Sequence, residues 1–238
     1  MPQLAPAAEL IDKLVVANRI LFQKGVVDGF GHVSVRHDQS PEHFLLARNM
    51  APGLVTRDDI LAFDLDGTAV DAAGRRVYLE RFIHGEIYRA RSDVHSVVHS
   101  HSPSVIPFGV TGRPLQPIFH MSGFLGQGTA LFEIRDIAGD TDMLISDRRL
   151  GAALASALGT RTTVLMRGHG STVVGASIEQ AVYRAIYAEV NAKLQLQAIT
   201  LGKVTYLNAQ EAAKAAAIND TQLARPWELW TREVGVIE

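Results

Sequence analysis

A short apolar run that ends in two closely spaced histidines constrains this chain more than any other feature. The run Val94–Pro103 reads V-H-S-V-V-H-S-H-S-P, and its valines predict a buried strand. Alternate residues of a strand point to one face and lie under about 7 Å apart, so the imidazoles of His99 and His101 can converge on one cation. The pair alone is equally compatible with two hydrogen-bonded histidines on a half-buried strand, and the neighbouring His95 is interpreted as structural.

The composition limits what such a site can contain. The 238 residues include no cysteine, so the chain forms no disulfide, and any bound metal is held by histidine, aspartate or glutamate. The net charge of −2 is spread without a basic face or polybasic run, which argues against nucleic acid or a membrane surface as partners. No apolar run approaches the ~18 residues of a membrane span, and the N-terminus lacks the layout of a signal peptide. We expect a cytoplasmic enzyme or binding protein.

Apolar periodicity and turn signals predict helices and strands along the whole length, with no repeat, linker or low-complexity tract. Ser177 and Gln180 form a capping-box pattern, and Ser146 or Asp147 is a second cap signal. Helices are predicted over 9–24, 77–91, 148–158, 178–201 and 209–218. Strands are predicted over 32–36, 44–47, 61–64, 68–70, within 94–103, and over 130–136, 162–166 and 173–175. This interleaving favours a single layered α/β or α+β domain.

Glu80 lies in the first turn of the helix predicted over 77–91. An acidic side chain is favourable near a helix N-terminus because of the helix dipole, and periodicity alone favours this structural interpretation. His84, one turn later, is expected on the helix surface or at an interface.

Two further histidines lie beside glycines. His120 belongs to the glycine-rich segment 118–128, which suits either a mobile active-site segment or an ordinary loop. His169 lies between two glycines after the strand predicted over 162–166. Flanking glycines allow the backbone an unusual turn that aims one side chain.

Together these motifs resemble the class II aldolase/adducin family. The matching features are Glu80, the H-S-H of residues 99–101, and the R-G-H-G around His169 with a capped helix after it. The segment G-F-G-H-V-S-V-R, residues 29–36, resembles the family's glycine-rich opening motif. The resemblance covers about residues 8–205 of a single domain, 1–238, and leaves 206–238 as a C-terminal helical tail. It implies an α/β fold with α-β-α layers, in which helices flank a central, mostly antiparallel sheet.

The resemblance also implies a metal site. Three histidines hold a divalent metal in the family's enzymes, and they match His99, His101 and His169, while the catalytic glutamate matches Glu80. We expect one ion per subunit, Mn²⁺ or Zn²⁺, with Fe²⁺ or Co²⁺ also compatible with three imidazoles. The family is usually tetrameric with active sites between subunits, so a homotetramer is expected.

Two departures from the sugar-phosphate aldolases of this family bear on the substrate. Small polar residues that seat the phosphate, commonly Ser-Ser, precede the glutamate in those aldolases, but Tyr78 and Leu79 stand there in this chain. His32 replaces the asparagine of the opening motif. Both changes argue against a phosphorylated sugar. The sequence looks similar instead to decarboxylases of hydroxylated aromatic or heteroaromatic acids, such as 3-hydroxy-2-methylpyridine-4,5-dicarboxylate and 3,4-dihydroxyphthalate decarboxylases.

The expected function is therefore a metal-dependent carboxy-lyase of aromatic catabolism that acts on a small hydroxylated carboxylate. Glu80 is the candidate for proton delivery. His120 is the second catalytic candidate, because it falls where the aldolases carry a tyrosine that reaches a neighbouring subunit's site. The candidates for substrate binding are His32, Arg36, Arg48 and Arg81, although an ordinary ion pair is the preferred interpretation of each arginine.

Two alternatives stay open. One is an aldolase or epimerase acting on a small aldol or a sugar phosphate, which needs the same metal and acid. The other is a non-catalytic, adducin-like module. Such a module has no use for the complete set of three histidines and a glutamate.

Overall fold

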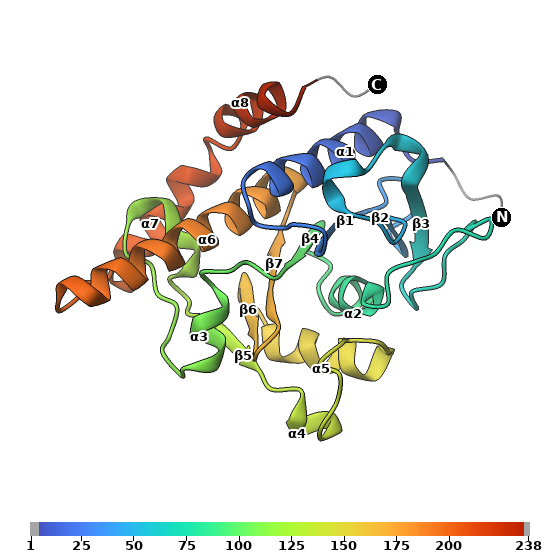
Figure 1. The fold of residues 1–238 in the computed structure, drawn as a ribbon. Helices are drawn as coiled ribbons and strands as arrows, with labels where there is room; N and C mark the ends of the chain where they lie inside the picture. The colour runs from blue at the N-terminus through green and yellow to red at the C-terminus, as the bar shows by residue number, and fades with distance from the viewer. Residues whose placement is uncertain (1–4, 236–238) are drawn as a thin grey trace.

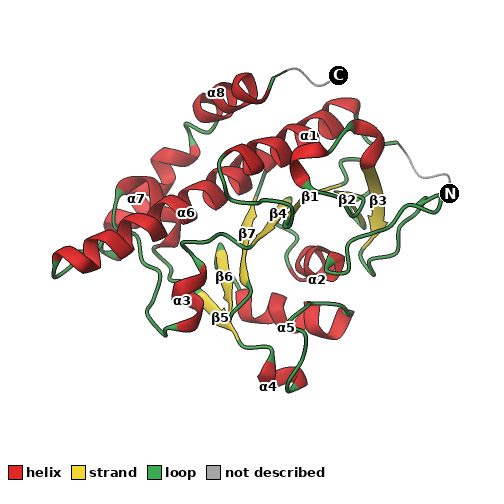
Figure 2. Ribbon diagram, in the orientation of Figure 1, coloured by secondary structure: helices red, strands yellow, loops and turns green. Residues whose placement is uncertain are grey.

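A seven-stranded sheet forms the centre of the molecule. In the computed structural model, which describes residues 5–235, the strand order is β3-β2-β1-β4-β7-β6-β5 (Figures 1 and 2). All neighbouring strands are antiparallel except β5 and β6. The strands are β1 (His32–Arg36), β2 (His43–Ala47), β3 (Ile60–Asp64), β4 (Ser96–Ser100), β5 (Ala130–Phe132), β6 (Thr163–Met166) and β7 (Gly170–Gly175). The expectation of a mostly antiparallel central sheet is confirmed.

Helices cover both faces of this sheet (Figure 1). They are α1 (Ala8–Gln23), α2 (Arg81–Ala90), α3 (Ile106–Val110), α4 (Arg135–Ala138), α5 (Arg148–Leu158), α6 (Ile178–Leu201), α7 (Ala209–Asp220) and α8 (Ala224–Val234). The 3-10 segments are η1 (Pro52–Leu54), η2 (Arg57–Asp59) and the longer η3 (His120–Leu125), which is kinked at Ser122.

Alternation along β4 divides the apolar core into two layers. Val98 belongs to the cluster beneath α1 and α6, whereas Val97 belongs to the cluster beneath α2 and α5. Because successive strand residues point to opposite faces, His99 shares the α2 face with Val97. On β1, which pairs with β4, Val33 and Val35 face α1, so His32 and Ser34 face α2.

Elements whose ends are set by local caps agree with the predictions. Asp147 accepts the Leu150 N–H at the start of α5, and Ser177 accepts the Gln180 N–H at the start of α6. The Gln180 side chain accepts the N–H of Ala176 rather than that of Ser177. The predicted limits of both helices, and of β1, match the structure.

Three predicted elements are corrected. Helix α2 begins at Arg81 rather than Val77, so Glu80 is the residue that precedes the helix and not a member of its first turn. The strand predicted over 68–70 reduces to one bridge between Phe63 and Ala69. The strand predicted over 130–136 ends after β5, and α4 follows it.

The C-terminal segment packs against the rest of the chain. Helix α7 contacts η3, and α8 contacts α1 and α6, with the Trp230 side chain buried in their shared core. Across residues 5–235, no helix combines the length and apolar character that a membrane crossing needs.

Candidate metal centre

Three adjacent strands bring the predicted ligands together. In the β1–β4 pair His32 lies opposite His99, and in the β4–β7 pair His99 lies opposite Thr172. His101 lies one residue beyond the end of β4, and His169 immediately precedes β7. The histidines therefore meet at the ends of the central strands although they are distant in sequence.

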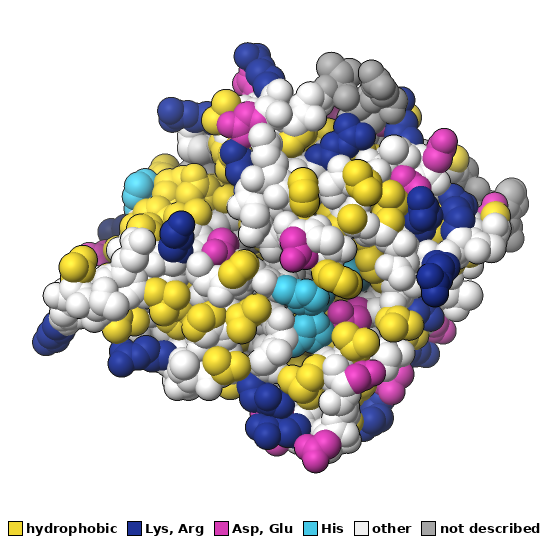
Figure 3. All heavy atoms as spheres, in the orientation of Figure 1, with side chains coloured by type: hydrophobic (Ala, Val, Ile, Leu, Met, Phe, Trp, Pro, Cys, Tyr) yellow, Lys and Arg dark blue, Asp and Glu magenta, His cyan; other side chains and the backbone are white. Residues whose placement is uncertain are grey.

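The side chains converge on one point. The Nε2 atom of His101 lies 3.3 Å from Nε2 of His99 and 3.1 Å from Nε2 of His169. Glu80 Oε2 lies 3.5 Å from Nε2 of both His99 and His169. The four ligand atoms all lie within 4.8 Å of one another. Figure 3 shows histidine side chains reaching the surface near the centre of one face, beside an acidic side chain and among hydrophobic ones.

This donor set fits a divalent cation. Two imidazole nitrogens bound to one tetrahedral ion at about 2.0–2.1 Å each lie about 3.3 Å apart, which is close to the spacing of the His99, His101 and His169 nitrogens. The Nδ1 atom of His169 lies 2.9 Å from the Met143 carbonyl oxygen, to which it donates. That hydrogen bond leaves the Nε2 lone pair of His169 directed at the centre.

Two glycines make the turn at His169 possible. Gly168 adopts φ +66°, a left-handed conformation that glycine accepts readily. At Gly170, a Cβ atom would lie 2.1 Å from the Ser100 carbonyl oxygen, so only glycine allows β7 to start this close to the end of β4. The G-H-G motif therefore serves both the turn and the close approach.

Glu80 is held as a carboxylate. Burial alone would raise its pKa, but the neighbouring His99 and His169 and the Ile145 N–H outweigh burial and lower the pKa to about 2. The Ile145 N–H donates to Glu80 Oε1 at 3.0 Å, which leaves Oε2 facing the histidines. Burial lowers the pKa of His99 to about 3. For His169, burial is outweighed by Glu80 and the Met143 carbonyl together, and the pKa is raised.

A cavity of about 290 Å³ opens beside the cluster. Glu80, His101 and His32 line it on the side of the sheet, and Tyr78 and Leu79 contribute apolar wall. The His32 and Tyr78 rings lie 4.6 Å apart between centroids. Phe30, whose side chain is largely exposed, lies at the rim of the same cavity. The arrangement offers a mostly apolar space with ligands and an acid at one end.

Arg36 and Arg81, both predicted substrate residues, do not line this cavity. The Arg36 guanidinium is buried and donates to four backbone carbonyls, those of Pro41, Tyr88, Arg91 and Val94. Arg81 donates to the carbonyls of Gly67 and Tyr78. Their donors therefore stabilise the chain itself.

Arg48 lies closer to the cavity. It precedes Asn49, which lines the cavity. Burial raises the pKa of the Tyr78 hydroxyl in the cavity wall to about 12, and the charge of Arg48 opposes part of this shift. Its Nε donates to Asp59 Oδ1 at 2.6 Å. Within residues 5–235, its two terminal nitrogens form no hydrogen bond.

The structure does not bring His120 into the cluster of its own chain. His120 is exposed at the start of η3, and its backbone carbonyl accepts a hydrogen bond from the Asn219 side chain of α7. Its assignment to a neighbouring subunit's site stays a prediction.

The expectation that His84 lies on the helix surface or at an interface is wrong. His84 is 0% exposed, and its Nε2 lies 2.7 Å from Nδ1 of His32. Its Nδ1 lies 2.6 Å from Ser34 Oγ, which in turn lies 2.7 Å from the Tyr88 hydroxyl. The sequence signals for this group were the i, i+2 spacing of His32 and Ser34 on a strand and the i, i+4 spacing of His84 and Tyr88 on a helix.

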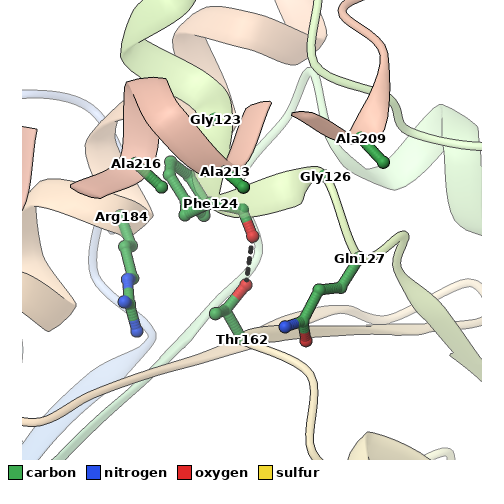
Figure 4. Close-up of a pocket in the computed structure, with 9 residues that line it drawn as sticks. All are labelled: Gly123, Phe124, Gly126, Gln127, Thr162, Arg184, Ala209, Ala213 and Ala216. Carbon is green, nitrogen blue, oxygen red and sulfur yellow. Dashed lines mark hydrogen bonds between the residues drawn. The ribbon is translucent and has the colours of Figure 1, made fainter. Parts of the chain in front are cut away.

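A second cavity, of about 230 Å³, lies between η3, α7 and α6 (Figure 4). Arg184 of α6 lines it together with Gln127 and Thr162, and Thr162 Oγ1 donates to the Phe124 carbonyl at 3.0 Å. Among the described residues that line it there is no histidine or acid. The cavity beside His101 is therefore the candidate active site.

Comparisons with known proteins agree with this geometry. The family described as Class II Aldolase and Adducin N-terminal domain matches residues 12–196. The chain is 38% identical to decarboxylase tropJ of Talaromyces stipitatus, over 96% of this chain and 95% of that protein. It is 34% identical to 3,4-dihydroxyphthalate decarboxylase of Arthrobacter keyseri, over 80% of this chain and 79% of that protein.

Solved structures share the fold. L-fuculose 1-phosphate aldolase from Glaciozyma antarctica PI12 matches with a TM-score of 0.78 and 25% identity, over 98% of this chain and 93% of that one. An aldolase II superfamily protein from Pseudomonas syringae matches with a TM-score of 0.80 and 24% identity, over 98% and 94% of the two chains.

Proposed function

The chain belongs to the class II aldolase and adducin family, and from this premise we propose that it is a metal-dependent decarboxylase of a hydroxylated aromatic or heteroaromatic carboxylate. The observation that carries the proposal is the convergence of Glu80 with His99, His101 and His169 at the end of an apolar cavity. The two relatives named as decarboxylases support the reaction class.

The cavity wall supports a ring rather than a phosphate as the bound group. A phosphate dianion needs several hydrogen-bond donors around it. Leu79 has none, and the Tyr78 hydroxyl is already committed to the Met50 carbonyl. The aromatic faces of Tyr78 and Phe30 suit a flat substrate instead.

The protein's own residues bind the substrate and transfer one proton. A divalent cation held by the three imidazoles would act as a Lewis acid for the electrons that remain when carbon dioxide departs. Glu80, resting as a carboxylate, takes the proton of the substrate hydroxyl as the substrate binds. It then returns this proton to the ring carbon that carries the carboxylate. The carbon–carbon bond breaks, its electron pair restores the aromatic ring, carbon dioxide leaves, and the product oxygen regains a proton from water.

We also propose the remaining assignments. One Mn²⁺ or Zn²⁺ ion, or Fe²⁺ or Co²⁺, would bind per subunit of a homotetramer with active sites between subunits. His120 of a neighbouring copy would complete the site, and His32 and Arg48 would bind substrate oxygens. Arg36 and Arg81 donate to backbone carbonyls and do not line the cavity, so the proposal does not assign them to the substrate.

A second candidate function is an aldolase reaction on a small aldol or sugar phosphate. The similarity to the L-fuculose 1-phosphate aldolase structure favours it. The purified protein, loaded with Mn²⁺ or Zn²⁺, separates the two candidates on a panel of 3,4-dihydroxyphthalate, related hydroxylated dicarboxylates and L-fuculose 1-phosphate. Release of carbon dioxide that requires the metal supports the decarboxylase. Release of an aldehyde without carbon dioxide refutes it in favour of the aldolase.

A further inference from the structure

A buried chain of hydrogen bonds runs from the active-site cavity into the protein. It connects His32 Nδ1 to His84 Nε2 at 2.7 Å, His84 Nδ1 to Ser34 Oγ at 2.6 Å, and Ser34 Oγ to the Tyr88 hydroxyl at 2.7 Å. The reaction described above uses none of the last three residues. All four side chains are buried, and only His32 lines the cavity.

Two elements interlock to build this chain. Strand β1 supplies His32 and Ser34 on its α2 face, and α2 supplies His84 and Tyr88 from successive turns. The residues alternate between the two elements along the path. Each imidazole is therefore fixed at both ring nitrogens or by its packing, since the His32 ring also lies against Tyr78 and 5.0 Å from the His99 ring.

The outer nitrogen of His32 is open to the cavity. Its Nε2 has no hydrogen-bond partner among the described residues, and this nitrogen is not fully buried. Because Nδ1 is used by His84, Nε2 is the atom that a ligand in the cavity meets.

The hydrogen bonds can be donated in one of two directions along this hydrogen-bond chain, and only one direction gives every buried donor an acceptor. The Tyr88 hydroxyl is the end of the chain, and among residues 5–235 its side-chain partner is Ser34. If Tyr88 donates to Ser34, then Ser34 donates to His84 Nδ1, and His84 Nε2–H donates to His32 Nδ1. The reverse order has Ser34 donating to Tyr88, so the Tyr88 proton has no acceptor, and an unpaired buried donor costs about 1–3 kcal/mol.

From this order we infer that His32 presents a protonated Nε2 to the cavity and donates it to an anionic oxygen of the substrate, with His84, Ser34 and Tyr88 as positioning residues that fix this tautomer. The inference rests on the proposed function for the identity of that oxygen, which is a phenolate or carboxylate oxygen beside the cation. His32 is thereby neither a fourth metal ligand nor a base, because both roles need a bare Nε2.

The hydrogen-bond chain holds the tautomer of His32 but does not supply the catalytic proton. Passing a proton out through His32 would leave Tyr88 as a buried phenolate. Burial raises the pKa of Tyr88, so this state is disfavoured. Proton delivery therefore stays with Glu80, and the chain contributes orientation.

Neutron diffraction from crystals of the zinc-loaded protein tests the inference directly, because deuterium positions are visible. We expect deuterium on Nε2 of His32 and Nε2 of His84, with the Tyr88 hydroxyl directed at Ser34. Deuterium on Nδ1 of His32, with a bare Nε2, overturns it. This measurement needs no variant and no turnover.

Kinetics of two matched serine variants provide the second test. Ser34→Ala removes the donor to His84 Nδ1, so both tautomers become comparable in free energy, and kcat/KM should fall roughly tenfold with bound zinc unchanged. Ser96→Ala removes an equally buried hydroxyl that donates to the Ser34 carbonyl and is not a member of the hydrogen-bond chain. It should stay within about twofold of wild type. Equal losses in both variants contradict the positioning role.

The two proposals fail separately. A protonated Nε2 in a protein that decarboxylates none of the aromatic acids refutes the proposed function and leaves the donor role standing for another oxygen ligand. A bare Nε2 in an active decarboxylase refutes this inference alone.

Discussion

Glu80 and His84 lie one helical turn apart at the start of α2 and serve two different networks. Glu80 Oε2 faces the histidine cluster, 3.5 Å from His99 Nε2, whereas His84 Nε2 supports His32 from behind at 2.7 Å. One helix thus positions both the acid and the support of a cavity residue. A shift of α2 would disturb proton transfer and substrate orientation together, while the metal ligands lie on other elements.

Replacing Glu80 by Gln should abolish most turnover and leave the metal in place. The amide keeps an oxygen acceptor for the Ile145 N–H but cannot accept and return a proton. Loss of a positioned acid–base group lowers kcat by roughly a hundredfold or more. The measurement is carbon dioxide release together with elemental analysis. Glu86→Gln, within α2 and paired with Arg148, is the control. Wild-type turnover by metal-loaded Glu80→Gln would refute the role.

Removing any one of His99, His101 or His169 should release the metal. Each contributes one of three imidazole nitrogens to the cluster, and two remaining imidazoles bind a divalent ion much more weakly. We expect metal content to fall from about one ion per subunit to a small fraction in each alanine variant after dialysis. His95→Ala, an exposed histidine just before the same strand, should retain its metal. Full occupancy in all three variants would disprove the ligand set.

Mild acid should destabilise the metal-free protein through its buried histidines. Burial lowers the pKa of both His84 and His99 to about 3, whereas the unfolded value is about 6.5. Below pH 6.5 these two histidines become protonated in the unfolded chain but stay neutral in the native state. The stabilisation is therefore complete above pH 6.5 and is lost as the pH falls toward 3, by up to about 1.4 kcal/mol per pH unit for each histidine.

Urea unfolding in the presence of a chelator, at pH 7.5, 6 and 5, measures this loss. Glu80 does not contribute in this window, because its pKa is lowered and its stabilisation is lost only below about pH 4.5. His169, whose pKa is raised, stabilises the native state as the pH falls and offsets part of the loss from His84 and His99. His84→Phe should be less stable at pH 7.5 but show a shallower decline. A free energy of unfolding that stays constant from pH 7.5 to 5 would contradict the neutral buried state.

The fold was predictable where the chain carries local signals. Asp147 and Ser177 cap their helices through bonds to residues three positions later, so the starts of α5 and α6 follow from sequence. The start of α2 does not, because Tyr78 is held by the Met50 carbonyl far away in sequence, and this contact keeps residues 77–80 out of the helix.

The metal ligands of the site could be predicted from the sequence, but the residues that hold the site in place could not. The H-x-H and G-H-G motifs mark His99, His101 and His169, but the resemblance to a family was needed to combine them. No local sequence pattern indicates that the Arg36 guanidinium donates to backbone carbonyls of a later segment. None indicates that His84 is hydrogen-bonded to a histidine of β1. Both facts depend on which strand and helix become neighbours.

Replacing Leu79 by Ser should weaken the binding of an aromatic substrate. Leu79 lines the cavity and is 59% exposed in the free chain, so its apolar surface is available to a ring. Loss of that contact should raise KM by about tenfold and change the free energy of unfolding by less than about 0.5 kcal/mol. Leu54→Ser is the control, because Leu54 is 71% exposed and does not line the cavity. An unchanged KM for Leu79→Ser would remove this wall from the substrate site.

Mixed assembly should show whether His120 acts in a neighbouring subunit. His120 is exposed and lies outside its own chain's cluster, so a catalytic role requires a second copy. His120→Ala should lower kcat without loss of metal. Subunits with His120→Ala and subunits with Glu80→Gln should each be nearly inactive as pure oligomers. After unfolding and joint refolding, about a quarter of the sites would combine an intact Glu80 with an intact His120 from the adjacent chain. Activity that rises toward that fraction supports the shared site, whereas hybrids no more active than the two parents would confine any role of His120 to its own chain.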